Sequence, residues 1–132
     1  MRVIKLEEFP FCDFGSNPPR KVRLPVSPET TGDKISITYV VVPPNGISEG
    51  HIHVETDEYI YFDIGGAALI DGNRVELPPH SIVLAQAGEK HECINISPDA
   101  DLRLLCVFVP PLSLSGKFVK LAERTKAYLR GE

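Results

Sequence analysis

The chain has 132 residues, 42% of them hydrophobic and 24% charged, a composition typical of one soluble globular domain and unlike that of a disordered chain or a coiled coil. Its net charge of −4 provides no general attraction for nucleic acid or anionic lipid, so we expect neither a nucleic acid nor a membrane as a partner. Two acids, Glu7 and Glu8, stand where a signal peptide needs an apolar run, and the longest later apolar run, Leu104 to Val109, is too short to span a membrane, so we expect a cytoplasmic protein.

Prolines interrupt the first 33 residues at positions 10, 18, 19, 25 and 28, which predicts an extended N-terminal segment over 1–33. Within it, basic and apolar residues alternate from Arg20 to Leu24, as in an edge strand with one solvated face. Phe9, Phe11 and Phe14 make the segment too apolar to remain uncovered, and strand edges also favour cover. We therefore expect a C2 homodimer.

From residue 34 the sequence changes to short apolar runs separated by turn residues. The tripeptide Asp71-Gly72-Asn73 indicates a hairpin, because these residues tolerate the positive φ of a tight turn. Including the two strands of this hairpin, seven strands are expected after the N-terminal one, over residues 35–42, 59–64, 67–70, 74–77, 81–85, 91–96 and 102–109. About eight strands with no helix between them predict a single all-β domain, an antiparallel sandwich or barrel over 34–110.

The C-terminal residues change to helical spacing, which predicts a short α-helix over 112–130 that ends near Gly131. We expect this helix to cover one end of the barrel or to contact another subunit, because its apolar face is small for a helix lying on a membrane. The positions on that face are Leu114, Phe118, Leu121, Ala122, Thr125 and Leu129.

Three of the four histidines combine with one acid in a pattern that indicates a metal site. In a strand, His51 and His53 point to the same face, and a short polar turn returns the chain at Glu58. His91 begins another strand and offers a third imidazole. Three imidazoles and a carboxylate suit a divalent transition metal, Fe, Mn, Ni, Zn, Co or Cu, rather than Ca or Mg. The alternative for an isolated His-x-His is two surface histidines.

The same residues resemble the first motif of the cupin family, whose members are small double-stranded β-helix barrels. In that motif His-x-His is followed by four residues, Glu, six residues and Gly, which corresponds here to His51, His53, Glu58 and Gly65. The leading glycine, Gly46, stands one position closer to the histidines than in the family pattern.

The second cupin motif is similar to the stretch from His80 to Asn95. Gly88, His91 and Asn95 match, whereas His80 replaces a glycine and Gln86 replaces a proline, both at turn positions. We otherwise expect His80 to be a solvated turn residue. The resemblance spans about residues 34–110 and implies a double-stranded β-helix, or jelly-roll barrel, with one metal ion held by His51, His53, Glu58 and His91.

Strand parity predicts which side chains share the interior with the metal. If Glu58 and His91 face inward, the residues two positions along each strand do so too. Cys93 is then either a small buried hydrophobe or, as the alternative, a fifth metal ligand or reactive thiol. The three cysteines of the chain form no close pair, which indicates reduced thiols. The expected substrate pocket is lined by Tyr39, Ile60, Phe62, Cys93 and Phe108.

The resemblance implies small-molecule chemistry but not one reaction, because one fold serves many activities. Four protein ligands leave two adjacent positions on an octahedral ion for a chelating, oxygen-rich metabolite. Without a further inward acid or histidine to act as a base, we favour dioxygenase-type chemistry. A metal-dependent isomerase, epimerase or lyase and a non-catalytic small-molecule-binding barrel are the alternatives.

Overall fold

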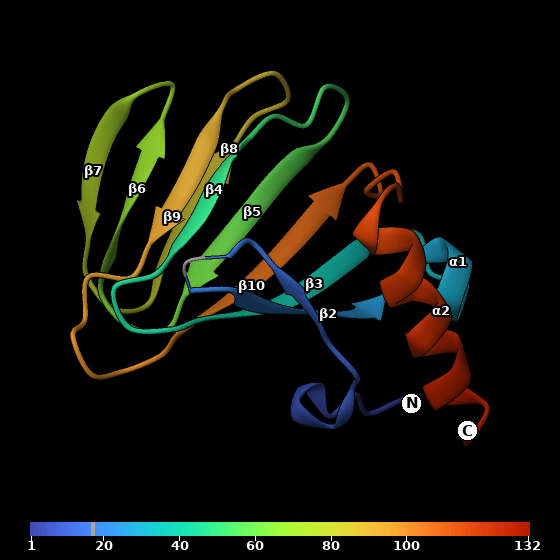
Figure 1. Cartoon of the computed structure of the whole chain (residues 1–132). Coiled ribbons are helices and arrows are strands. Elements are labelled where there is room, and N and C mark those ends of the chain that lie inside the picture. The colour runs from blue at the N-terminus through green and yellow to red at the C-terminus, as the bar shows by residue number, and fades with distance from the viewer. Residues whose placement is uncertain (17) are drawn as a thin grey trace.

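The computed structural model describes residues 1–16 and 18–132, with residues 49 and 50 described by their backbone alone, and its ten strands form two antiparallel sheets (Figure 1). The larger sheet has the order β1-β2-β3-β10-β5-β8 and the smaller β4-β9-β6-β7. The strands are β1 (Cys12–Phe14), β2 (Arg20–Val26), β3 (Ser36–Val42), β4 (Ile47–His51), β5 (Asp57–Phe62), β6 (Gly66–Ile70), β7 (Asn73–Leu77), β8 (Ser81–Ala85), β9 (His91–Ile94) and β10 (Leu102–Val109). The predicted all-β antiparallel fold is confirmed.

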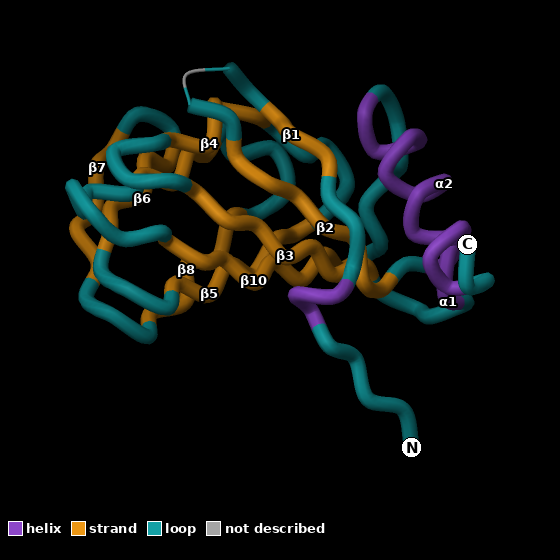
Figure 2. The backbone as a smooth tube through the Cα atoms, turned by 60° about the horizontal axis from the view of Figure 1, so that its bottom comes forward, coloured by secondary structure: helices purple, strands orange, loops and turns teal. Residues whose placement is uncertain are grey.

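The two sheets face one another across the interior. Figure 2 shows β4, β6 and β7 on one side of the barrel and β3, β5, β8 and β10 on the other. The hairpin of β6 and β7 turns at Asp71 and Gly72, which have φ values of 48° and 82°. Positive φ at both central residues matches the right-handed twist of the flanking strands, as the sequence predicted.

The N-terminal segment is part of the larger sheet rather than an appendage. Its strand β2 pairs with β1 on one side and β3 on the other, so the edge position predicted for it is wrong. A short helix α1 (Pro28–Thr31) follows, although prolines were expected to prevent helices here. Proline fits the first turn of a helix, whose N–H groups have no helical partner, and Ser27 caps this one by accepting a hydrogen bond from the Thr30 N–H.

The three N-terminal phenylalanines are covered by their own chain. Phe9 packs on Tyr128 at 4.8 Å and Phe14 on Phe118 at 4.9 Å between ring centroids, and Phe11 lies under the guanidinium of Arg23. The reason for expecting a homodimer from these residues is therefore removed, because they already have intramolecular partners. The homodimer stays a prediction.

Helix α2 (Lys117–Leu129) lies at one end of the barrel beside α1 (Figure 1) and begins five residues later than the predicted 112. Its residues Leu121, Ala122 and Thr125 are buried, and the Thr125 hydroxyl donates to the Leu121 carbonyl. The apolar face thus packs on the barrel. Among the described residues, no helix has the length and apolarity that crossing a membrane would require.

The core lies between the sheets and continues under α2. Its largest fully buried side chains include Phe62, Ile60 and Leu24. Asn95 is also buried, and its amide NH2 group donates to the carbonyls of Val42, Pro43 and Ala100, with one of its two hydrogens shared between two of them. These three bonds tie the end of β3 to the loop before β10, because a buried amide must find partners within the protein.

Candidate functional site

Four side chains from both sheets meet inside the barrel. His51 ends β4 and His91 begins β9, and these two residues pair across the smaller sheet. Glu58 comes from β5 of the larger sheet, where it lies opposite Phe108 of β10. His53 lies two residues beyond the end of β4, in the loop, rather than within a strand as predicted. The Gly88 N–H holds that loop by donating to the His53 carbonyl at 2.9 Å.

The ligand atoms of these four residues all lie within 4.8 Å of one another, so the cluster could hold a metal ion. Glu58 Oε1 is 2.9 Å from His91 Nε2, 3.2 Å from His53 Nε2 and 3.9 Å from His51 Nε2. The side chains of Glu58 and His91 are 5% and 2% exposed, whereas His51 is 35% exposed. The cluster is therefore buried on the Glu58 side and reaches solvent at His51.

Electrostatics keep the carboxylate charged. Burial of Glu58 favours its neutral form, but the imidazoles of His51, His53 and His91 outweigh burial and hold the pKa of Glu58 well below its ordinary value. Burial likewise opposes the charged form of His91, but the hydrogen bond to Glu58 and its negative charge raise the pKa of His91. Both shifts favour an ion pair between Glu58 and His91, whose Oε1 and Nε2 atoms lie 2.9 Å apart.

Two features of the histidines fit a metal ion. The Nδ1 of His91 lies 3.2 Å from the backbone carbonyl of Glu89, and because a carbonyl only accepts, Nδ1 carries the proton. This bond fixes the ring and leaves Nε2 for a ligand, as is usual for metal-binding histidine. The Nε2 of His53 is buried, lies 3.2 Å from Glu58 Oε1 and has no hydrogen-bond partner in the described structure. An ion would satisfy that atom.

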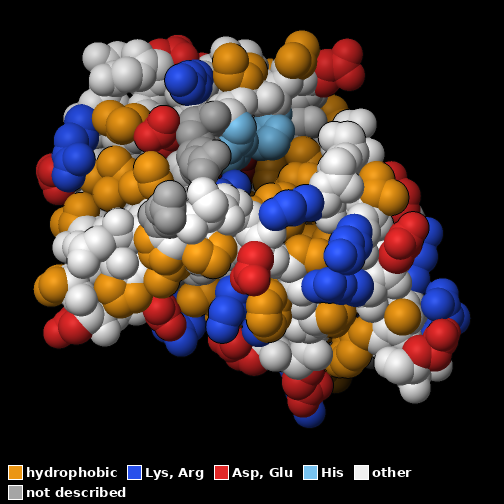
Figure 3. All heavy atoms as spheres, in the orientation of Figure 1, with side chains coloured by type: hydrophobic (Ala, Val, Ile, Leu, Met, Phe, Trp, Pro, Cys, Tyr) orange, Lys and Arg blue, Asp and Glu red, His pale blue; other side chains and the backbone are white. Residues whose placement is uncertain are grey.

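The cluster forms part of the wall of a cavity of about 290 Å³. Figure 3 shows histidine side chains in a hollow of the surface, next to hydrophobic and basic side chains. Val22, Val40, Leu104 and Phe108 give the wall a mostly apolar character. Its volume is close to the lower end of small-ligand pockets, so the site suits a small molecule with an apolar flank.

Two of the five residues predicted to line the pocket do so, Cys93 and Phe108. Tyr39 does not, because its neighbours in β3, Thr38 and Val40, face the cavity and Tyr39 points to the opposite face of the sheet. There its hydroxyl donates to Glu7 Oε1 at 2.6 Å.

Ile60 and Phe62 face inward with Glu58, but neither is a lining residue of the cavity. They are 1% and 0% exposed and pack in the hydrophobic core below the site. The inward-facing side of β5 is therefore as predicted. The alternation of side chains along a strand does not tell which of the inward-facing residues reach the cavity and which are covered by the core.

Cys93 is a buried thiol of the kind expected for a small hydrophobe. Burial and the nearby charge of Glu58 raise the pKa of Cys93 to about 12, against the opposing effects of the Ser48 hydroxyl and Arg20. The pKa of Cys106, another lining residue, is also raised, mainly by burial. Both thiols are therefore protonated at neutral pH in the metal-free protein, which disfavours a role as a nucleophile. All three cysteines are free and buried.

Several lining residues had no recognisable signal in the sequence. Phe14, Arg20 and Phe118 come from β1, β2 and α2, far from the histidines along the chain, and Thr38 and Ser48 line the wall as small hydroxyl residues. Only tertiary packing brings them together.

His80, by contrast, is exposed as expected in a turn, with a φ of 63°, and forms a hydrogen bond with the Tyr61 hydroxyl away from the cluster.

Comparison with known proteins agrees with this geometry. A family model described as the cupin domain matches residues 38–108. L-ectoine synthases of Rhodococcus opacus (strain B4) and Rhodococcus jostii (strain RHA1) are each 30% identical to the chain over 87 residues. The match covers 62% of the chain and 63% of each enzyme, so the chain spans somewhat less than two thirds of these curated relatives.

Solved structures share the fold at low sequence identity. A predicted oxalate decarboxylase from Thermotoga maritima has a TM-score of 0.72 and 19% identity, over 81% of the chain and 97% of that protein. Ectoine synthase from P. lautus has a TM-score of 0.68 and 21% identity over 86% and 80% of the two chains. KdgF from Halomonas sp. has a TM-score of 0.65 and 17% identity over 83% and 94%.

Proposed function

The chain belongs to the cupin family, and from that premise we propose that it is a metal-dependent enzyme acting on a small, oxygen-rich metabolite. The main support for this proposal is one cluster of side chains in the wall of a mostly apolar cavity. Its ligand atoms, which lie within 4.8 Å of one another, come from His51, His53, Glu58 and His91. We propose these four residues as the ligands of one divalent transition metal ion. Fe, Mn, Ni, Zn, Co and Cu all fit a set of three imidazoles and one carboxylate.

The donor set fits such an ion on two further grounds. The buried Nε2 of His53 has no hydrogen-bond partner in the described structure, and the bond from His91 Nδ1 to Glu89 presents His91 Nε2 to the centre. When bound, the ion would supply a Lewis acid and, if redox-active, a centre for dioxygen chemistry. The chain supplies the ligand charge at Glu58 and an apolar wall that limits water around the substrate.

Dioxygenase-type chemistry is the first candidate reaction. Among the described lining residues, Glu58 is the only acid and the histidines are the three of the cluster. The thiols of Cys93 and Cys106 have raised pKa values and hold their protons, so neither is a general base at neutral pH. A cavity that offers no separate base favours a reaction in which the protein mainly orients the substrate and excludes water.

Lyase or isomerase chemistry is the second candidate, and the comparisons favour it. The curated relatives are L-ectoine synthases, and a solved ectoine synthase shares the fold. In this case the bound ion would act only as a Lewis acid that polarises a carbonyl group of the substrate. A non-catalytic barrel that only binds a small molecule is the outcome if no turnover is found.

The two reactions are separated by the metal and by oxygen. The purified protein is loaded with Fe(II) or with Zn and offered 2-hydroxy acids, 2-oxo acids and catechols in an oxygen electrode and, anaerobically, in deuterated water. A dioxygenase should consume oxygen only with Fe(II) and lose turnover with Zn. A lyase or isomerase should work anaerobically and incorporate deuterium into a carbon of the product. Binding of a probe without turnover under any condition would favour the binding protein.

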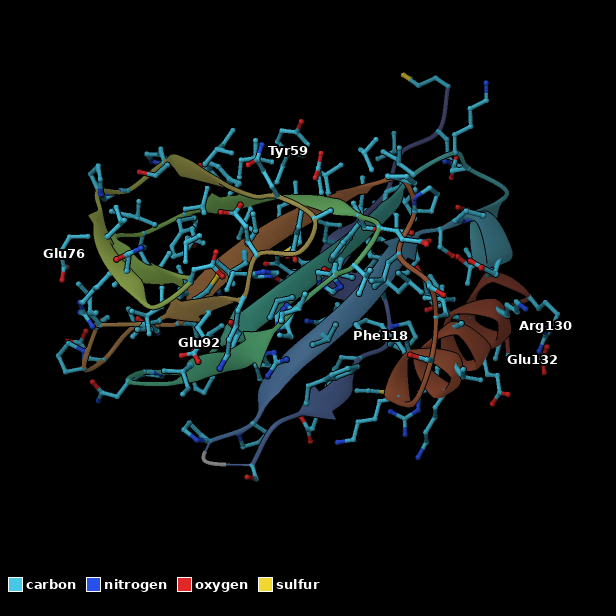
Figure 4. The ribbon with its side chains drawn as sticks, turned by 90° about the horizontal axis from the view of Figure 1, so that it is seen from above. Tyr59, Glu76, Glu92, Phe118, Arg130 and Glu132 are labelled. Atoms are coloured by element: carbon cyan, nitrogen blue, oxygen red, sulfur yellow. The ribbon has the colours of Figure 1, made fainter. Side chains whose placement is uncertain are left out.

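We also propose that the chain forms a homodimer, through the outer face of the larger sheet. Two cross-strand rows of this face consist of aliphatic and tyrosine side chains without a charged residue, and within them Ile82, Leu84 and Tyr59 are 68%, 42% and 42% exposed. Figure 4 shows Tyr59 pointing away from the barrel. A band without charges can pack on its own copy about a twofold axis without opposing like charges. The rows are Leu84–Tyr59–Val107–Ile37 and Ile82–Tyr61–Leu105–Tyr39.

A further inference from the structure

One wall of the cavity is built by parts of the chain outside the matched cupin region, 38–108. Phe14 of β1, Arg20 and Val22 of β2 and Phe118 of α2 line the cavity, and all precede or follow that region. Phe14 and Phe118 pack on each other at 4.9 Å, and Figure 4 shows Phe118 between α2 and the strands. This wall, which we call the terminal wall, is therefore held by contacts between the two ends of the chain.

The terminal wall contributes a basic side chain to the cavity. Among the described lining residues, Arg20 is the only Lys or Arg. Its guanidinium carbon lies 5.7 Å from the centroid of the Phe14 ring, so the ring supports the group from one side. A planar guanidinium with several N–H donors recognises a carboxylate better than other side chains do. The cavity thus combines the four-residue histidine and glutamate cluster, an apolar wall and one guanidinium group.

We propose that the terminal wall selects the substrate, and that the substrate is a small acid whose carboxylate binds Arg20 while an apolar flank packs on Phe14 and Phe118. The proposal rests on the proposed function, since the opposite end of the substrate would contact the four-residue cluster. It narrows that function to molecules with two polar ends separated by a short hydrocarbon segment. A cavity of about 290 Å³ lies near the lower end of the volumes of ligand pockets, which agrees with a small substrate.

The test uses two probes that differ only at the far end. 2-Hydroxyglutarate and 2-hydroxypentanoate share a chelating 2-hydroxy acid, and the first has a second carboxylate where the second has a methyl group. Binding to the Zn-loaded protein is measured by calorimetry. We expect the wild type to bind 2-hydroxyglutarate about tenfold more tightly, the size typical of one charge-assisted hydrogen bond.

Variants then assign the preference to one residue. In Arg20→Gln the two probes should bind within about twofold of each other, as expected when the charged donor is removed. Arg20→Lys, which retains the charge, should keep part of the preference. Lys21→Gln is the matched control, because Lys21 is the exposed neighbour in β2, lies near Phe11 and is not a lining residue. Equal binding of both probes by the wild type, or an unchanged preference in Arg20→Gln, would overturn the proposal.

Two measurements distinguish a failure of the proposed metal site from a failure of the proposed role of the terminal wall. Metal content is determined for each variant, and Arg20→Gln should retain the same content as the wild type. The probes are also compared by thermal shift on the metal-free protein, where 2-hydroxyglutarate should still stabilise the wild type more than 2-hydroxypentanoate does. A chain that holds no metal but keeps this difference would contradict the proposed function alone. A chain that holds metal but shows no difference in either state would contradict the terminal wall's role alone.

Discussion

Replacing Glu58 by Gln in the metal-free protein should reveal the charge pair at the centre of the cluster. Glu58 Oε1 lies 2.9 Å from His91 Nε2, with both side chains almost fully buried. Removing one partner of a buried ion pair costs about 3–5 kcal/mol. Glutamine keeps an acceptor for His91, and His91 can release its proton, so we expect a smaller loss, about 1–3 kcal/mol. For a domain of this size, the loss corresponds to a Tm lower by roughly 3–12 °C.

The pKa shifts of His91 and Glu58 determine the pH range in which their ion pair stabilises the folded protein. The pKa of His91 is raised in the folded protein, so its contribution to stability is complete below its unfolded pKa and is lost as the pH rises through the folded pKa. The pKa of Glu58 is lowered, so its contribution is present above its unfolded pKa and is lost as the pH falls through the folded pKa. The wild type should therefore be more stable than Glu58→Gln by the largest amount between the unfolded pKa of Glu58 and the unfolded pKa of His91, that is, in mildly acidic solution.

The assay is urea unfolding in the presence of a chelator, at several pH values from mildly acidic to mildly alkaline. The difference in unfolding free energy between the wild type and Glu58→Gln should shrink as the pH rises through the folded pKa of His91. A difference that does not vary with pH, or a variant more stable than the wild type throughout, would refute the ion pair as the source.

Three further predictions concern the metal site, the core and the assembly. His53→Ala should lower bound metal to less than about one tenth of an ion per chain and abolish the chelator-sensitive part of the melting temperature, whereas the exposed His80→Ala should retain both; equal metal in the two variants, determined by elemental analysis, would count against the site. Phe62→Ala should cost about 3–5 kcal/mol in urea unfolding, because Phe62 is 0% exposed, and a loss below 1 kcal/mol would contradict its place in the core. Sedimentation at micromolar concentration should show a dimer that Ile82→Lys dissociates and that Val75→Lys, a change at an exposed apolar residue of the other sheet, leaves intact; a wild-type species of 14.6 kDa would exclude the dimer.

Much of the barrel could be predicted because its strands have local signals. The strands β8 (Ser81–Ala85) and β10 (Leu102–Val109) have the predicted bounds, since turn residues flank short apolar runs. The position of β2 could not be predicted, because the alternation of basic and apolar residues does not tell whether a further strand covers its edge. That strand, β1, has only three residues and little pattern of its own.

The candidate site divides in the same way. The four ligands were predicted from the spacing of three of them and from the resemblance to the cupin motifs, and the structure brings the ligand atoms of His51, His53, Glu58 and His91 within 4.8 Å. The residues of the cavity wall were harder to predict, because the packing of the two sheets decides which face of β3 points inward. Tyr39 was therefore assigned to the wrong face. Arg20 had no signal for a role in the cavity, since packing of the two chain ends places it there.

Elemental analysis of the purified protein tests the central claim most directly. The protein is measured as isolated, and again after chelation, exposure to one divalent transition metal at a time and removal of unbound ions. The metal-site hypothesis predicts about one ion per chain in the wild type, loss of that ion in Glu58→Gln combined with His53→Ala, and a higher melting temperature for the loaded wild type alone. Less than one tenth of an ion per chain after exposure to each of the six metals, with melting unchanged, would contradict it.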